Sequence, residues 1–236
     1  MKNIFTFLLF CSLISYGQNP GYSIGSNGLT YFNPRSSQNA LEIEILNSPY
    51  NNNFYQEGKI TIHEKPGFVT KMRYNAAKNV IEFKEEDGTV KELLRRPYIS
   101  AEFGGKEYVV FKYVVPYTKN EKLGYFNPLN NGKTQLLYMP EKSLEVSGYS
   151  TQERRSGSYS DKSSYYIKKA GRPAVEINLN KSSILGQLDT SYHEELKDFV
   201  TKNNLNLRNE ADVLALLKHY NLLLSTGNAF TKPVQS

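Results

Sequence analysis

The sequence predicts an α+β protein: an antiparallel β-meander, forming a curved sheet or an open barrel, followed by a C-terminal helical hairpin. Three observations predict this fold class. The 236 residues include 18 Tyr and 12 Phe, which favour strands. Apolar residues alternate with polar ones from residue 41 to residue 180. After residue 180 the apolar residues recur at helical spacing instead.

The alternation indicates antiparallel strands that turn one face to a core and the other to water. Met72 and Tyr74, for example, alternate with Lys71 and Arg73. Turn signals rich in Gly and Asn separate the runs and predict hairpins between about ten to twelve strands. These signals lie at residues 85–88, 104–105, 130–132 and 170–173.

Two segments depart from the alternation. Residues 108–115 are apolar on both faces except for Lys112, which is typical of a central strand with a layer packed on each side. Pro116 ends this run, because proline cannot donate to a sheet ladder. Residues 147–164 include seven serines and predict a long loop or linker.

The helical region begins with Ser191 and Glu194, whose spacing predicts a capping box. Asn209 is the expected cap of a second helix. Because both helices are too short to be stable alone, we expect them to pack on the sheet or on each other. Their apolar stripes comprise Tyr192, Leu196, Phe199 and Val200 in the first helix, and Val213, Leu216, Leu217 and Tyr220 in the second.

Residues 1–17 have the features of a secretory signal peptide: a positive start, an apolar run over residues 4–14 and small residues before the predicted cleavage between Gly17 and Gln18. The run is shorter than the about 20 residues that span a bilayer, so we expect no transmembrane span in the mature chain. Cys11, the single cysteine, lies inside the run, so the mature chain would contain none. The sequence therefore predicts an exported protein, periplasmic or extracellular, with association to the outer membrane as a further option.

The predicted organisation has one mature domain. Its segments are the signal peptide at 1–17, a loosely ordered N-terminus at 18–40, the antiparallel β region at 41–180, the helical hairpin packed on the sheet at 181–227 and a C-terminal tail at 228–236.

The charge is moderately basic. The net charge of +6 falls to +5 when Lys2 leaves with the signal peptide. Lys and Arg are interleaved with Glu along the strands, which favours a mixed solvated surface. An exported protein would meet anionic lipid or glycan rather than nucleic acid, so we expect no nucleic-acid partner.

Catalytic motifs are missing from the sequence. It contains no G-x-S-x-G, P-loop, G-x-G-x-x-G or H-E-x-x-H pattern, and Lys197 stands where a zinc motif beginning at His193 needs its second His. His63 is expected on the solvent face of a strand, and His219 near the end of the last helix. We therefore predict no catalytic residue, no metal ligand and no cofactor.

Two weaker signals concern binding. The doublets Arg95-Arg96 and Arg154-Arg155 could contact an anion, although solvation is the favoured interpretation. Tyrosines in or near predicted loops suggest stacking on sugar rings, although the absence of Trp weakens this hypothesis. These tyrosines are Tyr31, Tyr50, Tyr55, Tyr125, Tyr149 and Tyr159.

Several segments in this order resemble a family of uncharacterised exported proteins of Gram-negative bacteria. The resemblance covers most of the mature chain and implies export, but no activity and no catalytic residues. Its segments are Arg73–Asn75, Ile81–Lys84 with Asp87-Gly88, Tyr165–Lys169, Val175–Ile177, Lys181–Leu185 and Leu216–Asn221.

The sequence favours a non-enzymatic binding or interaction protein of the cell envelope, whose partner could be a protein, a lipid or a glycan. Two alternatives stay open. The one-sided apolar strands also suit a carrier of a lipid or other apolar ligand inside a curved sheet. The third hypothesis is an enzyme with an unfamiliar site built from scattered Tyr, Arg and Glu.

Overall fold

The computed structural model describes residues 22–24, 30–32, 43–147 and 155–227. These belong to two compact units, one drawn from residues 1–46 and 146–157 and the other from residues 47–145 and 158–236. The predicted signal peptide, its cleavage site and most of the predicted loose N-terminus lie outside the described residues. No helix among the described residues is long and apolar enough to cross a membrane.

The first unit contains three short antiparallel strands, β1 (Tyr22–Ile24), β2 (Thr30–Phe32) and β3 (Ile43–Leu46), paired in that order. Part of the serine-rich segment also forms a strand. Strand β13 (Arg155–Asp161) lies beside β12 (Lys142–Ser147), so the predicted loop at 147–164 is wrong for these residues. The small, alternating side chains of β13 fit a strand as well as a linker. Residues 148–154 lie outside the described part.

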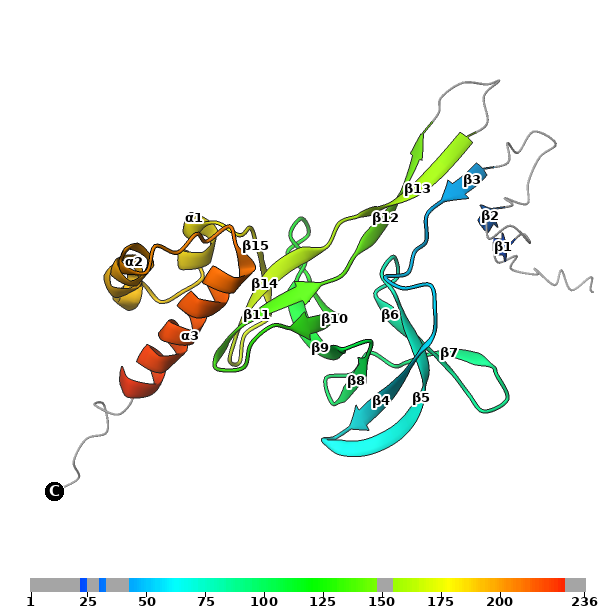
Figure 1. Ribbon diagram of the computed structural model, residues 1–236, viewed down its shortest axis with the longest axis horizontal. Coiled ribbons are helices and arrows are strands. Elements are labelled where there is room, and N and C mark those ends of the chain that lie inside the picture. Colours follow the sequence, from blue (N-terminus) through cyan, green and yellow to red (C-terminus); the bar gives the residue numbers. More distant parts are fainter. Residues whose placement is uncertain (1–21, 25–29, 33–42, 148–154, 228–236) are drawn as a thin grey trace, which may run out of the picture. The chain divides into compact units, whose positions relative to one another are not determined.

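The second unit is built on a ten-stranded antiparallel sheet that curls into a half-barrel, with helices at the C-terminal end of the chain (Figure 1). This confirms the predicted fold class. The strand order is β15-β14-β11-β10-β9-β8-β4-β5-β6-β7, so β4 rather than β7 pairs with β8. The strands are β4 (Gln56–Ile62), β5 (Lys65–Asn75), β6 (Val80–Lys84), β7 (Val90–Glu92), β8 (Ile99–Phe103), β9 (Lys106–Val114), β10 (Glu121–Pro128), β11 (Thr134–Met139), β14 (Ser164–Lys169) and β15 (Val175–Ile177).

The predicted turns lie between these strands. Gly88 and Gly104 have positive φ values of 85° and 59°, which glycine adopts without the strain that a Cβ would bring. The β4–β5 turn was not predicted. It consists of His63 and Glu64, with φ of 50° and 62°. His63 therefore does not lie on a strand face; its ring stacks on Tyr98, with 4.2 Å between centroids.

The inner face of the curl is filled by the protein's own side chains. They form one buried cluster from β4, β5, β6, β8, β9 and β10, and the alternating residues point inward as the period-two pattern predicts. Apolar side chains thus occupy the space that the carrier hypothesis assigns to a ligand. The cluster comprises Ile60, Met72, Tyr74, Ala76, Ile81, Ile99, Ala101, Phe103, Tyr108, Val110 and Tyr125.

Strand β9 has a layer on each face, as the sequence predicts. Tyr108 and Val110 point into the cluster inside the curl. Phe111 and Tyr113 point the other way and pack on a second cluster around Phe126. The strand ends at Val114, two residues before Pro116.

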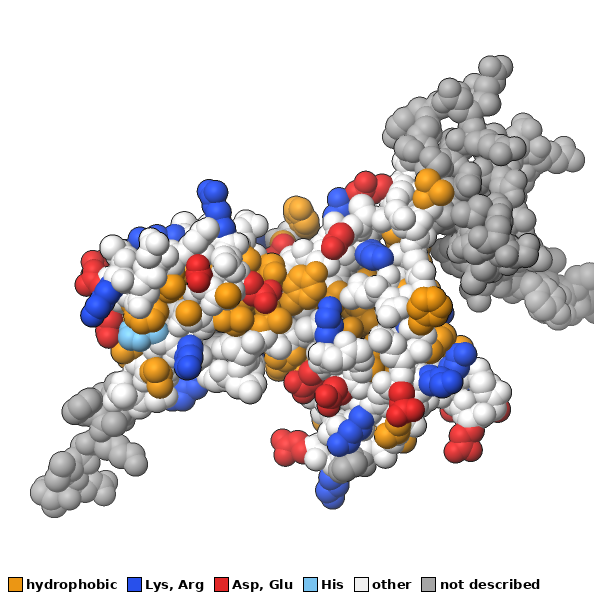
Figure 2. Space-filling view, in the orientation of Figure 1, with side chains coloured by type: hydrophobic (Ala, Val, Ile, Leu, Met, Phe, Trp, Pro, Cys, Tyr) orange, Lys and Arg blue, Asp and Glu red, His pale blue; other side chains and the backbone are white. Residues whose placement is uncertain are grey.

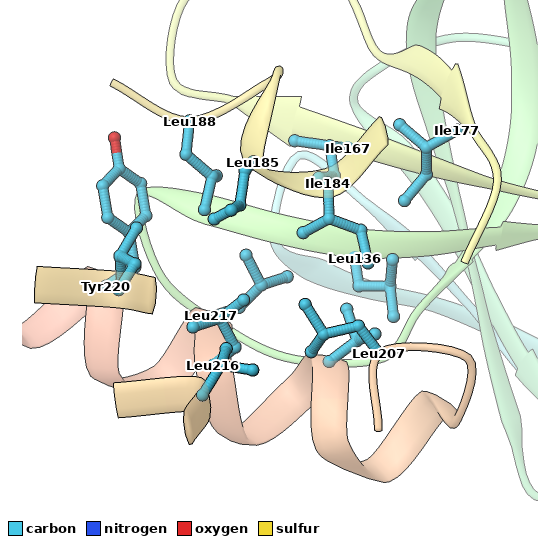
Figure 3. Packing of buried hydrophobic residues seen from close by; sticks show 13 residues of the cluster. Leu136, Ile167, Ile177, Ile184, Leu185, Leu188, Leu207, Leu216, Leu217 and Tyr220 are labelled. Carbon is cyan, nitrogen blue, oxygen red and sulfur yellow. The ribbon is translucent and has the colours of Figure 1, made fainter. Parts of the chain in front are cut away.

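Helices cover the face of β11 and β14 that carries Leu136 and Ile167. They are α1 (Lys181–Leu185), a 3-10 helix (Thr190–Tyr192), α2 (His193–Lys202) and α3 (Glu210–Gly227). Figure 3 shows Leu216 and Leu217 of α3 facing Leu136 of the sheet, with Ile184 and Leu185 of α1 closing the layer. Both predicted apolar stripes are confirmed, because Leu196 and Val200 of α2 and Val213 and Tyr220 of α3 are buried in this cluster.

The helix caps differ in part from the prediction. Asn209 caps α3, since its Oδ1 accepts a hydrogen bond from the Ala211 N–H at 3.0 Å. The predicted capping box is wrong. Asp189 caps the 3-10 helix through Ser191 N (3.1 Å), and Glu194 pairs with Lys197 instead (2.7 Å). The 3-10 turn moves the chain's capping position two residues upstream of Ser191.

Candidate binding groove at the seam of the curled sheet

Asn79 joins the curled end of the sheet to β10. We call this junction the seam. It lies in the turn between β5 and β6 with φ of 52°, a conformation that Asn tolerates better than most residues. Its Oδ1 accepts from Tyr125 N at 2.7 Å, and its Nδ2 donates to Tyr125 O at 3.3 Å. The amide side chain thus makes the pair of bonds that a neighbouring strand would make.

Tyr125 also stabilises this seam, through a side chain in the interior. Its ring is fully buried, and its hydroxyl donates to the carbonyl oxygens of Leu93 (3.3 Å) and Leu94 (3.2 Å). Burial raises the pKa of the Tyr125 hydroxyl, which stays protonated and able to donate. Tyr125 is therefore a core residue, and its predicted role in sugar stacking is wrong.

A groove of about 480 Å³ opens beside this seam. One wall is the chain that follows β7, and the other is the start of β10. Val80, Leu93 and Leu123 give it apolar surface, while Leu94 is 63% exposed at its edge. The complete lining is Val80, Glu92, Leu93, Leu94, Arg95, Arg96, Lys122 and Leu123.

The groove is locally basic. Arg95, Arg96 and Lys122 line it, and none of them forms an ion pair within the described part of the chain. The single lining carboxylate, Glu92, lies 3.6 Å from Lys78. On the face shown in Figure 2, positive and negative side chains are interspersed, as the sequence predicts. The doublet Arg95-Arg96 is therefore part of a concave basic site rather than of a uniformly mixed surface.

A second groove, of about 470 Å³, lies where β11 and β14 meet the helices. Lys133, Lys169 and Arg172 line it, but so does the carboxylate of Asp189. Lys169 already donates to Gln187 O at 2.6 Å, which reduces its capacity to bind a ligand. Each groove is thus lined by three cations and one carboxylate, but the carboxylate of the seam groove, Glu92, is paired with Lys78, a cation outside the lining.

The densest polar cluster in the second unit serves to hold the chain together. Glu82, 8% exposed, accepts from Arg73 Nε and Nη2 at 2.9 and 2.8 Å, and Asn75 Nδ2 donates to it at 3.3 Å. The guanidinium carbon of Arg73 lies over the rings of Tyr50 and Tyr55, 3.7 Å and 4.4 Å from their centroids. Burial, with the charge of Glu82, raises the pKa of Tyr50 to about 12.

Two of the tyrosines proposed for sugar binding are engaged in these contacts, because the rings of Tyr50 and Tyr55 lie against Arg73 and their hydroxyls donate to Glu82. The side chains of Tyr31 and Tyr149 lie outside the described part, and Tyr159 is in β13. The sugar hypothesis thus loses three of its six residues to structural roles or burial. The alternating pattern predicts that Arg73 and Glu82 face solvent. It does not show that residues 47–55 fold over these two side chains.

The histidines have structural contacts. His193 Nε2 lies 2.9 Å from Leu185 O, which ties α2 to α1. His219 is eight residues before the end of α3, not near its end, and stacks on Phe199 with 4.0 Å between ring centroids. Within the described residues, no group of three His, Cys, Asp or Glu side chains could hold a metal ion.

Comparison of the chain with known protein families, with characterised proteins and with solved structures finds no match. The resemblance to exported proteins of Gram-negative bacteria therefore stays a prediction, and the function has to be argued from the groove itself.

Proposed function

We propose that this protein is an exported, non-enzymatic binding protein of the cell envelope, and that an anionic partner docks in the seam groove. The observation that supports this proposal is the set of three cations around one concave apolar surface. Arg95, Arg96 and Lys122 lack carboxylate partners there, so an anionic ligand would supply them. Apolar contacts with Leu93 and Leu123 would add affinity.

Export is the first part of the proposal. The features of residues 1–17 support it, and the cleavage between Gly17 and Gln18 is directly testable. Expression of the full chain in a Gram-negative host should give a mature protein whose first residue is Gln18, found outside the cytoplasm by fractionation. A full-length cytoplasmic product would contradict export.

Docking in the groove is the second part. A photo-crosslinking amino acid in place of Leu94, 63% exposed at the groove, should yield an adduct in intact cells. The same amino acid in place of Tyr117, 96% exposed and outside the groove lining, is the matched control.

Charge reversal sharpens the docking test. The triple variant Arg95→Glu, Arg96→Glu and Lys122→Glu should abolish the Leu94 adduct, because it makes the groove acidic. Reversal of three exposed lysines elsewhere on the sheet, Lys59, Lys71 and Lys106, should leave the adduct intact. Equal adducts at Leu94 and Tyr117, or an adduct that survives the groove triple, would overturn the docking proposal.

A further inference from the structure

The groove contains a strand edge with no neighbouring strand. Strand β10 pairs with β9 along Glu121–Phe126, but with β11 only through Asn127 and Pro128. The first part of β10 therefore has no strand on its second side. On that side, the Asn79 side chain bonds to the backbone N–H and C=O of Tyr125. Arg95 Nη1 donates to Leu123 O at 3.3 Å.

A free donor on this edge is Leu123 N–H. Within a strand, the N–H and C=O of one residue point to the same side. Because Leu123 O faces Arg95 across the groove, Leu123 N–H faces the groove as well. The bond from Val115 N to Asn120 O sets the alternation of the β9–β10 pair, in which Leu123 faces away from β9. Among the described residues, no backbone bond outside the strand ladders takes up its N–H.

On the opposite wall, Glu92 also has backbone groups that no strand pairs with. Leu93 N donates to Ile81 O at 2.8 Å, so Leu93 faces β6. By the alternation of a strand, the preceding residue Glu92 directs its N–H and C=O away from β6. Glu92 also lines the groove. Strand β7 is the last strand of the sheet and pairs with β6 alone.

We propose that the groove binds an extended acidic segment of a partner protein as an added β-strand, paired with Leu123 of β10. This inference rests on the proposed function and names the partner of that site. Backbone bonds to the edge would give affinity, and side chains on alternate positions would give specificity. Acidic residues on one face of the segment would meet Arg95, Arg96 and Lys122, while apolar residues on the other would meet Leu93 and Leu123.

The test uses the purified exported protein and a labelled synthetic peptide of alternating Glu and Val. Fluorescence anisotropy should show saturable binding that the groove triple abolishes. NMR amide exchange should then slow at Leu123 when the peptide is bound, because its N–H gains a partner. Exchange at Tyr125 should not change, since its N–H is already bonded to Asn79.

The matched control is the same peptide with alternate backbone nitrogens methylated, which keeps charge and side chains but removes donors and crowds the edge. We expect binding at least about tenfold weaker. Equal binding of the methylated peptide, or unchanged exchange at Leu123, would overturn strand addition.

The two proposals fail separately. If the Leu94 adduct forms in cells and is lost in the groove triple, but the Glu-Val peptide does not bind, strand addition is overturned while docking stands. Binding of anionic phospholipid vesicles instead of the peptide would have the same meaning. If the Leu94 adduct does not form, the proposed function itself is overturned.

Discussion

The faces of the ten-stranded sheet are covered in different ways at its two ends. Around β11 and β14 both faces are covered, one by the helices and the other by the cluster around Phe126. Around β4 to β7 the sheet covers itself by curling, and side chains join the turn between β5 and β6 and the chain after β7 to β10 at a seam. The covered end leaves little backbone free, whereas the curled end leaves a groove with unpaired backbone groups. The contrast suggests that stability is concentrated at the helical end and binding at the seam.

The largest expected effect tests the helical end. Leu217→Ala removes a side chain that is fully buried among α1, α3 and the sheet, so the free energy of unfolding should fall by about 2–5 kcal/mol. Leu222→Ala on the same helix, where the side chain is 58% exposed, should change it by less than about 0.5 kcal/mol. Urea unfolding of both variants measures the difference. Equal midpoints would show that the helices do not belong to the cooperative core.

The next effect concerns the pair that holds residues 47–55 on the curled end. Arg73→Met leaves the nearly buried Glu82 carboxylate without its cation and should cost about 2–3 kcal/mol. The double variant Arg73→Met with Glu82→Leu should cost less than Arg73→Met alone, because no unpaired charge remains. A double-mutant cycle by urea unfolding decides this. Additive costs would mean that the two side chains are not coupled.

A smaller effect is expected at the seam. Asn79→Gly keeps the positive φ but loses both bonds to Tyr125, and should cost about 1–2 kcal/mol. Asn79→Ala should cost slightly more, since Ala tolerates φ of 52° less well. Amide exchange at Tyr125 N should accelerate in both variants. Unchanged exchange there would show that Asn79 does not close the curl.

The last effect concerns pH and is expected at both ends. Burial raises the pKa of Tyr108 inside the curl to about 12, and burial together with Glu210 does the same for Tyr165 under the helices. The folded state therefore keeps these protons at pH values where the unfolded chain, with a pKa of 10.0, has lost them. The contribution of these two hydroxyls to the free energy of unfolding is fully present below pH 10 and is lost as the pH rises towards about 12.

Tyr108→Phe and Tyr165→Phe should each reduce this alkaline loss. Urea midpoints measured at several pH values up to about 12 give the comparison. If both variants lose stability as steeply as the unsubstituted protein between pH 10 and about 12, other groups govern alkaline unfolding.

Local patterns predicted much of this molecule. Gly88 and Gly104 marked their hairpins, the double-faced pattern of 108–115 marked a central strand, and Leu196 and Leu216 marked the buried helix faces. These features depend on neighbours within a few residues, and periodicity reports such neighbours directly. The same holds for Asn209 as a cap, because its partner Ala211 is two residues away.

The features that make the groove depend on distant residues. Asn79 reads as a turn residue in the sequence, and nothing nearby indicates that it bonds to Tyr125, 46 residues away. Arg73 and Glu82 follow a solvent-facing pattern, yet residues 47–55 cover them. The doublet Arg95-Arg96 was a visible signal, but its meaning depended on Lys122 and Leu123 across the seam. Pairings of this length cannot be read from composition or spacing.

The length of the Asn79–Tyr125 connection has a consequence for how the protein folds. Joining residues 46 positions apart costs more chain entropy than forming any of the hairpins along the way, so we expect the seam to form after the folding barrier. Loss of Asn79 should then accelerate unfolding while hardly slowing refolding. A bound strand at the seam would act in reverse, lengthening the lifetime of the folded state without changing how fast it is reached.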